Sequence, residues 1–340
     1  MNNAAEGDPG FSSETAYAFE SIFGRVLYNW NYKYYVSASI RRDGSSRFGI
    51  DVREGTFWSF GASWRMDQEP FIQGIGWIDA LKLRASYGLT GNAEIGNFAW
   101  LPLISFTESY DESPGGAPSS VGNSKLSWEE NKSFNIGIDF TVFDRVSGII
   151  EYYNRESDNL LLNVPISRTS GFRSATENLG TMKNTGVEIT LNADVIRGGD
   201  FTWSVGANLA FNNNEITQLD EPFVAGTHDR FFRSEGHEFN EYHVYDWAGV
   251  NPDDGRPLFY TDETRTETTS DIGEAERFFI GKSGTPDMIG GFNTQLGWRD
   301  FFVDANFTTT WNNWLYDATA WVTQGDGRFT PRSQTQLVLD

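Results

Sequence analysis

The chain of 340 residues contains no cysteine and only three histidines. Without cysteine it can form no disulfide, no thiolate metal site and no thiol nucleophile. It contains no run of about 18 apolar residues, so the sequence predicts no transmembrane helix. Basic residues are scarce as well: 26 Lys and Arg stand against 47 Asp and Glu, a net charge of −21. That balance argues against a nucleic-acid partner, whose phosphates require clustered cations.

The three histidines offer little support for catalysis. His228, His237 and His243 fall in one long polar segment, at spacings that match no metal-ligand motif. A metal or proton-transfer site is conceivable there, but ordinary loop histidines are the simpler interpretation. The sequence has no G-x-S-x-G elbow, no H-E-x-x-H and no phosphate-binding glycine loop. We therefore predict no catalytic residue, no cofactor and no metal site, and we expect that the chain is not an enzyme.

What the chain does contain is long stretches of alternating apolar and polar residues. In the segment 81–90, five apolar residues alternate with Lys82, Arg84, Ser86, Gly88 and Thr90. Because successive strand side chains point to opposite faces, such a segment forms a strand with one apolar and one polar face. A strand that crosses a membrane needs about 9–11 residues, which is longer than a typical soluble strand.

About ten such strands follow one another along the chain, joined alternately by short turns and long loops. Bacterial outer-membrane barrels have this asymmetry, with short periplasmic turns and longer extracellular loops. Trp30, Trp77, Trp203 and Trp298 fall near the short turns, where an interfacial aromatic belt is expected. The predicted strands are 18–29, 34–42, 58–65, 82–90, 133–140, one through Tyr152 and Tyr153, 187–194, 201–209, and a pair joined by Arg299-Asp300. Two of the predicted loops begin at Asp43 and at Asn213.

The polar face of these strands supplies the candidate site. Its inward positions would suit hydrophilic solutes or a polar plug, and generic wetting of a barrel interior is the simpler alternative. The candidates for substrate or plug contact are Lys82, Arg84, Asp139, Glu188, Asn192 and Asn208. Aromatic residues in the loops could stack on sugar rings, clasp a peptide or pack the loops together; they are Trp100, Tyr110, Phe223, Phe231 and Phe232.

Several motifs go beyond a generic barrel and occur in a fixed order. They are IRRDGSSRFG at 40–49, LKLRASYGLTGN at 81–92, LSWEENK at 126–132, NIGID at 135–139, YYN at 152–154, NLG at 178–180, NTGVE at 184–188, IGK at 280–282 and GGF at 290–292. In these motifs the sequence resembles the SusC/RagA-type TonB-linked outer-membrane receptors of Bacteroidetes. The resemblance extends over most of the chain.

The resemblance implies a 22-stranded plugged barrel that imports oligosaccharides or peptides as nutrients across the outer membrane. It also implies energy from the TonB–ExbB–ExbD complex and a SusD-like lipoprotein at the cell surface. We therefore expect residues 1–340 to form a single, partial, all-β transmembrane barrel domain in contact with outer-membrane lipid. The plug domain and the terminal strands are expected to be absent from this sequence.

Two alternatives remain open at this stage. One is a complete ten-stranded outer-membrane barrel with a hydrolytic site in its loops, which would require catalytic groups to converge there. The other is a soluble glycan-binding β-sandwich, which would bury its apolar strand faces between two sheets.

Overall fold

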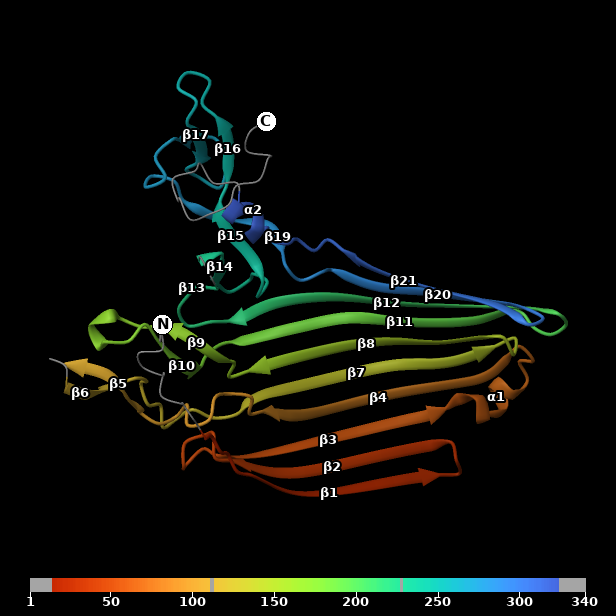
Figure 1. The fold of residues 1–340 in the computed structure, drawn as a ribbon. Coiled ribbons are helices and arrows are strands. Elements are labelled where there is room, and N and C mark those ends of the chain that lie inside the picture. The colour runs from red at the N-terminus through yellow and green to blue at the C-terminus, as the bar shows by residue number, and fades with distance from the viewer. Residues whose placement is uncertain (1–13, 111–112, 227–228, 324–340) are drawn as a thin grey trace, which may run out of the picture. The chain divides into compact units, whose positions relative to one another are not determined.

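The computed structural model describes residues 14–110, 113–226 and 229–323. Ten antiparallel strands lie side by side in one sheet, in the order β1-β2-β3-β4-β7-β8-β11-β12-β20-β21 (Figure 1). They are β1 (Phe19–Trp30), β2 (Tyr34–Ser45), β3 (Glu54–Arg65), β4 (Ile78–Asn92), β7 (Glu129–Val142), β8 (Val146–Asp158), β11 (Thr181–Ile196), β12 (Phe201–Gln218), β20 (Met288–Trp298) and β21 (Phe301–Trp311). The all-β prediction is confirmed, and the sheet is open, with β1 and β21 at its edges. In the described residues no helix is long and apolar enough to cross a membrane.

Short turns and long loops alternate along the chain as predicted, except that the connection 66–77 is longer than the loop 46–53. One end of the sheet carries the connections 31–33, 66–77, 143–145, 197–200 and 299–300. The other end carries the connections 46–53, 93–128, 159–180 and 219–287. The short turns that follow β1, β7 and β11 gather at one end of the sheet, opposite the end that carries β5, β6, β9 and β10 (Figure 1).

The connections contain small elements that alternation did not predict. The connection 66–77 holds the short helices η1 (Met66–Gln68) and α1 (Pro70–Gln73). The long connections and the end of the described chain hold β5 (Ile104–Tyr110), β6 (Ser113–Pro118), β9 (Leu161–Pro165), η2 (Arg168–Ser170), β10 (Ser174–Asn178), β13 (Phe223–Ala225), β14 (Phe231–Arg233), β15 (Glu241–Tyr245), β16 (Trp247–Val250), β17 (Pro257–Tyr260), β18 (Thr268–Thr269), β19 (Arg277–Ser283) and α2 (Ala318–Thr323).

Two predicted loop starts were wrong, because β2 and β12 continue beyond their apolar stretches. Asp43 was expected in a loop but lies in β2, 5% exposed, and its carboxylate accepts hydrogen bonds from Arg41 and Ser21. Asn213 was expected to begin the longest connection, yet β12 runs on to Gln218. Beyond the apolar band, hydrogen bonds and ion pairs between polar side chains on neighbouring strands can continue the strand pairing. A strand can therefore extend past the end of its alternating apolar pattern.

Apolar side chains are exposed in the middle of the sheet instead of being buried. Ile40, Phe60, Ile138 and Ile150 are 58%, 50%, 44% and 44% exposed. A soluble β-sandwich would cover such positions with a second sheet, and an apolar patch of this extent marks a membrane or partner surface. The sheet therefore presents an apolar face that requires a lipid solvent.

A buried core lies instead at the end of the sheet with the long connections. Phe48, Phe57, Leu126 and Trp128 form this loop-end core, each at most 5% exposed. The Trp128 ring lies 5.0 Å from Phe48 and 5.2 Å from Phe57, and its Nε1 donates to the Arg53 carbonyl at 3.0 Å. The core thus joins the motif segments 40–49, 81–92 and 126–132, which are distant in the sequence.

One glycine at this core has no room for a side chain. A Cβ on Gly91 would lie 2.0 Å from the Cζ atom of the buried Phe57 ring. A ring held among Phe48, Leu126 and Trp128 cannot move aside without opening the core. The glycine in the segment 81–92 is therefore required by packing.

The cross-strand register shows that the apolar band crosses the strands obliquely. One row of directly paired residues on the apolar face consists of Tyr34, Trp64, Leu83, Ile138, Ile150, Ile189 and Leu209. At the short-turn end of β2, the aromatic residue that marks the edge of the apolar band is Tyr34, which belongs to this row. At the short-turn end of β12 the corresponding residue is Trp203, which lies six residues before Leu209, the member of the row on β12. Six strand-to-strand steps separate β2 from β12, so the band shifts by one residue per step.

This stagger fixes the inclination of the strands to the band. With about 3.4 Å of rise per residue and about 4.8 Å between strands, one residue per step gives a tilt of about 35°. Transmembrane barrels have strand tilts of about 35–45°, because tilt and stagger are linked in a closing sheet. The register therefore agrees with a barrel wall seated in a membrane.

The short-turn end carries the expected aromatic belt. Trp30 stacks on Tyr34 with 5.5 Å between ring centroids, and Tyr34 stacks on Trp64 at 6.2 Å. Trp77 stacks on Phe143 at 5.6 Å. Aromatic rings of this kind suit an interface because they combine an apolar body with a polar edge.

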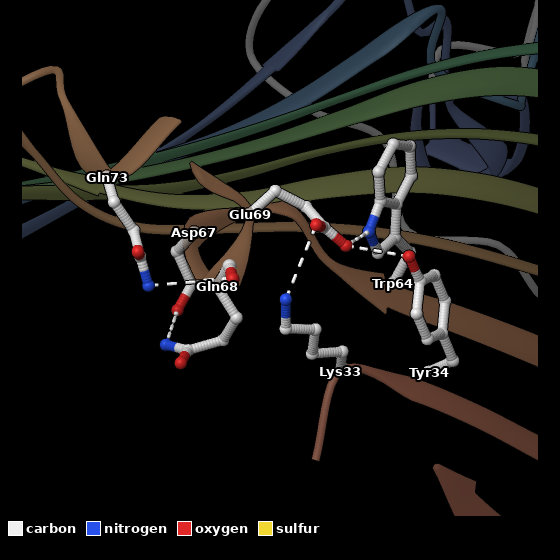
Figure 2. A network of polar contacts seen from close by, with 7 residues as sticks. All are labelled: Lys33, Tyr34, Trp64, Asp67, Gln68, Glu69 and Gln73. Carbon is white, nitrogen blue, oxygen red and sulfur yellow. Dashed lines mark hydrogen bonds and ion pairs between the residues drawn. The ribbon is translucent and has the colours of Figure 1, made fainter. Parts of the chain in front are cut away.

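One carboxylate organises the polar edges of this belt, as Figure 2 shows. Glu69 accepts hydrogen bonds from the Tyr34 hydroxyl at 2.7 Å and from Trp64 Nε1 at 3.1 Å. The Lys33 ammonium lies 3.4 Å from its other oxygen. The bonds from Tyr34 and Trp64 lower the pKa of the Glu69 carboxyl. Glu69 thereby ties the first short turn to the connection between β3 and β4.

Replacing Gly91 by alanine should destabilise the loop-end core. The added methyl would overlap the Phe57 ring, and overpacking of a core costs about 1–3 kcal/mol. Gly24→Ala is the matched control, because nothing lies within 4 Å of a Cβ at that strand glycine. Denaturant unfolding of the protein in detergent measures both variants. Equal unfolding midpoints for Gly91→Ala and Gly24→Ala would contradict the packing described.

The Glu69 network should make stability depend on pH. The folded pKa of Glu69 lies below its ordinary value of 4.5, so the stabilisation is complete above that value and is lost as the pH falls through the folded pKa. Glu69→Gln should therefore unfold more easily than wild type at pH 7, and the difference should disappear in acid. Glu54→Gln, which removes an exposed carboxylate, is the control and should change stability little at either pH. A Glu69→Gln deficit that persists in acid would refute the assignment.

Candidate functional site: the polar face of the sheet

All six predicted contact residues lie on the same face of the sheet, opposite the apolar band. Directly paired strand residues share a face. Lys82 pairs with Asp139, Glu188 pairs with Glu151, and Thr190 pairs with Asn208. Arg84 and Asn192 lie two residues from Lys82 and Thr190 and so share that face. The structure thus places the predicted residues together; whether they contact a substrate or plug stays a prediction.

Arg84 is the centre of an ion cluster that joins three strands. Its Nε donates to Asp139 Oδ1 at 2.9 Å, and its guanidinium also pairs with Glu151 on β8. Lys82 Nζ lies 3.7 Å from the other Asp139 oxygen. The side chains of Lys82, Arg84 and Asp139 are 41%, 32% and 30% exposed, so solvent screens each pair. Such pairs fix side-chain positions more than they stabilise the fold.

Glu188 adds a like charge beside this cluster. It is exposed and lies directly opposite Glu151, whose carboxylate is engaged by Arg84. Three carboxylates, on Asp139, Glu151 and Glu188, therefore accompany the two cations Lys82 and Arg84. Directly opposed like charges repel, so a cationic or hydrogen-bond-donating group would be attracted to this position.

The side chains of the predicted contact residues Asn192 and Asn208 occupy the space left by glycines on neighbouring strands. A Cβ on Gly206 would lie 2.9 Å from Asn192 Oδ1, and a Cβ on Gly291 would lie 2.4 Å from Asn208 Oδ1. Asn293, on β20, also approaches Gly206. The glycines leave room for amide side chains to lie along the sheet, where they present donors and acceptors to the polar side.

An open depression of about 370 Å³ lies on this part of the sheet. It extends the charged cluster toward Arg65 and Asp67, where Arg65 donates to the Asp67 carboxylate at 2.7 Å. Burial favours protonation of Asp67, but hydrogen bonds from Arg65 and Gln68 outweigh it and lower the pKa of the carboxyl. The residues that line it are Arg65, Asp67, Ala80, Lys82, Asp139, Phe140, Thr141, Ser147, Gly148, Ile149, Thr190 and Asn192. Its size suits a small solute or a segment of protein.

Sequence reasoning missed Glu151 and Tyr153 as members of the polar face. Glu151 lies opposite Gly137, which leaves space for its contact with Arg84. The Tyr153 hydroxyl donates to Asn212 Oδ1 at 2.7 Å, above Gly186. The register across the turn 143–145 would have identified both, but alternation alone does not reveal that turn's length.

One histidine and several loop aromatics pack within the protein where they are described. His243 lies between Phe232 and Phe279, with 4.9 Å between ring centroids in each pair. The His237 carbonyl accepts a backbone hydrogen bond from Ile216. Among the described residues no group of three or more His, Asp or Glu is arranged to hold a metal. His228 and the Tyr110 side chain lie outside the described residues.

Two of the loop aromatics, for which ligand contact and loop packing were both left open, are also engaged within the protein. Trp100 Nε1 donates to the Ser46 carbonyl at 3.2 Å, and its ring packs against the loop-end core. Phe231 stacks on Tyr242 at 5.3 Å. These contacts favour the interpretation that the rings pack the loops together.

Known proteins match this chain over most of its length. The family model described as TonB dependent receptor-like, beta-barrel, matches residues 2–270. A TonB-dependent receptor of Formosa agariphila is 36% identical over 349 residues, covering 89% of this chain and 33% of that protein. The TonB-dependent receptor SusC of Bacteroides thetaiotaomicron is 31% identical over 337 residues, covering 91% and 33%. The chain thus spans about a third of the length of the curated relatives it matches.

A solved structure reproduces the arrangement of the sheet. The structure of the RagAB peptide transporter superposes with a TM-score of 0.86 at 31% identity, covering 95% of this chain and 36% of that one. The similarity covers nearly all of this chain, so the predicted SusC/RagA resemblance is confirmed. The chain belongs to the TonB-dependent receptor-like β-barrel family of the bacterial outer membrane, and within it to the SusC/RagA type.

Proposed function

We propose that this chain forms part of the wall of a TonB-dependent importer that carries oligosaccharides or peptides across the outer membrane. The observation that carries the proposal is the single sheet with one apolar and one polar face, staggered by one residue per strand. The apolar face contacts lipid, and the polar face lines the route of a hydrophilic cargo. Long connections lie outside the cell, and short turns lie in the periplasm.

The open edges of the sheet support a role as a segment of a larger barrel. β1 and β21 are not neighbours, so each leaves a row of backbone groups without a strand partner in this sheet. In lipid each unsatisfied backbone group costs several kcal/mol, and membrane sheets therefore close. Further strands of a longer receptor would cover both edges. A complete ten-stranded hydrolase is disfavoured by the same argument.

The partners follow from the family. We infer that a SusD-like lipoprotein cooperates with the receptor at the cell surface and that the TonB–ExbB–ExbD complex supplies energy. A peptide cargo is supported by the similarity to the RagAB peptide transporter, and an oligosaccharide cargo is the alternative that the SusC/RagA resemblance implies. The three carboxylates near Arg84 favour cargo that donates hydrogen bonds. We assign the chain no catalytic role.

Deletion and complementation test this function. Deleting the full-length gene should abolish growth on one polymer, and the wild-type gene should restore it. Arg84→Gln should restore growth with an uptake rate about two- to fivefold lower, the range expected for a partly exposed ion cluster. Arg42→Gln is the matched control, since it breaks an ion pair on the opposite face and should leave uptake unchanged.

Uptake of radiolabelled candidate peptides and oligosaccharides measures the effect, with receptor abundance held equal. Unchanged uptake of every candidate nutrient in the deletion strain would reject the import function. A deficit for Arg42→Gln as large as that for Arg84→Gln would reject the assignment of the polar face to the cargo route.

A further inference from the structure

A row of alternating charges lies on the apolar side of the sheet, at the end with the long connections. Lys132 pairs directly with Glu156, Glu156 with Lys183, and Lys183 with Glu215. Lys132 Nζ lies 3.3 Å from Glu156 Oε1 and also pairs with Asp158. Because side chains two residues apart share a face, this row continues the face that carries Phe134 and Tyr152.

A polar cavity of about 600 Å³ opens at this row. It has the size of a small-ligand site and offers ammonium, amide, hydroxyl and carboxylate groups on one wall. Asp158 is its most sheltered carboxylate beside Lys132, with a side chain 20% exposed. The lining residues are Lys132, Glu156, Asp158, Asn159, Asn178, Leu179, Gly180, Thr181, Thr217, Gln218 and Asp220. So polar a lining excludes an acyl chain.

An exposed apolar strip begins directly below the cavity on the same strands. Phe134, Ile136 and Tyr152 are 38%, 39% and 41% exposed. Residues two apart on a strand lie about 7 Å apart on the same face. The apolar strip therefore begins about 7 Å from the charged row, so that one lipid molecule can contact both. A polar cavity continuous with an apolar strip matches an amphiphile, with a polar head and apolar chains.

The charge of the cavity indicates which kind of polar headgroup it would bind. Three carboxylates, Glu156, Asp158 and Asp220, surround the single ammonium of Lys132. Net negative charge repels a bare phosphate, whereas carboxylate oxygens accept strong, charge-assisted hydrogen bonds from sugar hydroxyls. The amide of Gln218 and the hydroxyls of Thr181 and Thr217 provide further sugar contacts.

We propose that this surface binds the sugar headgroup of a glycolipid in the outer leaflet of the membrane, with its acyl chains along Phe134, Ile136 and Tyr152. The proposal rests on the outer-membrane position of the chain and is independent of the cargo. The site faces lipid, so a membrane-anchored ligand reaches it by lateral diffusion. Its carboxylates accept hydrogen bonds directly from sugar hydroxyl groups, without a bridging cation.

Native mass spectrometry of the full-length receptor in detergent tests the proposal, with purified lipopolysaccharide freed of its phosphate groups as the probe. Asp158→Asn with Gln218→Ala should lower the apparent affinity about thirtyfold, the loss expected for one charge-assisted and one neutral hydrogen bond. Gln218→Ala alone touches no ion pair and should lower it about threefold. Glu54→Gln is the control, because it removes a carboxylate on the same face outside the cavity. It should bind as wild type does.

Binding that persists in EDTA supports direct hydroxyl contacts, and its loss in EDTA overturns them. Equal affinities for wild type, Gln218→Ala and the double variant would also overturn the proposal. Equally tight binding of the headgroup oligosaccharide freed of its acyl chains would assign the cavity to a soluble solute instead. Should the double variant fail to assemble, Gln218→Ala decides alone. Cargo uptake by Gln218→Ala should stay at the wild-type rate, so failure of the import proposal remains a separate result.

Discussion

The constraint on which this structure depends is the absence of water in a lipid bilayer. A spanning backbone must pair all its N–H and C=O groups internally, and each side-chain face must match its own solvent. An antiparallel sheet meets both demands, because its ladder pairs the backbone while alternation separates apolar from polar side chains. The edge strands β1 and β21 each leave one row of backbone groups without a partner in this sheet, and the proposed closure by further strands of a longer receptor would pair them.

The two ends of the sheet are stabilised by different means. At the short turns, Glu69 gathers the polar edges of Tyr34 and Trp64, so the aromatic belt is held by hydrogen bonds at the water boundary. At the long connections, Phe57 and Trp128 are buried by protein, and the loops acquire a core of their own. Between these ends the sheet has no internal core and relies on lipid on one side and a polar interior on the other.

The strand pattern was predictable because alternation and turn length are local properties. The faces of Lys82 and Arg84 followed from alternation alone. Glu151 did not, since its place beside Arg84 depends on the register across the turn 143–145. The ends of β2 and β12 were misjudged because polar pairing extends the ladders beyond the apolar band. The contact of Gly91 with Phe57 is tertiary, and no local pattern indicates it.

Lipid depth measured by spin labels tests the central claim most directly, and the absence of cysteine from these 340 residues allows single labels to be introduced. In the full-length receptor, labels at 82–87 should alternate between lipid and water with a period of two residues. Following the directly paired residues from Ala38 on β2 across the sheet leads to Asn213 on β12. Because the band shifts by one residue at each of the six steps, a label at Ala38 should lie at the same membrane depth as a label at Ala207, six residues before Asn213. Equal depth for Ala38 and Asn213 instead, or water contact throughout 82–87, would contradict a tilted membrane wall.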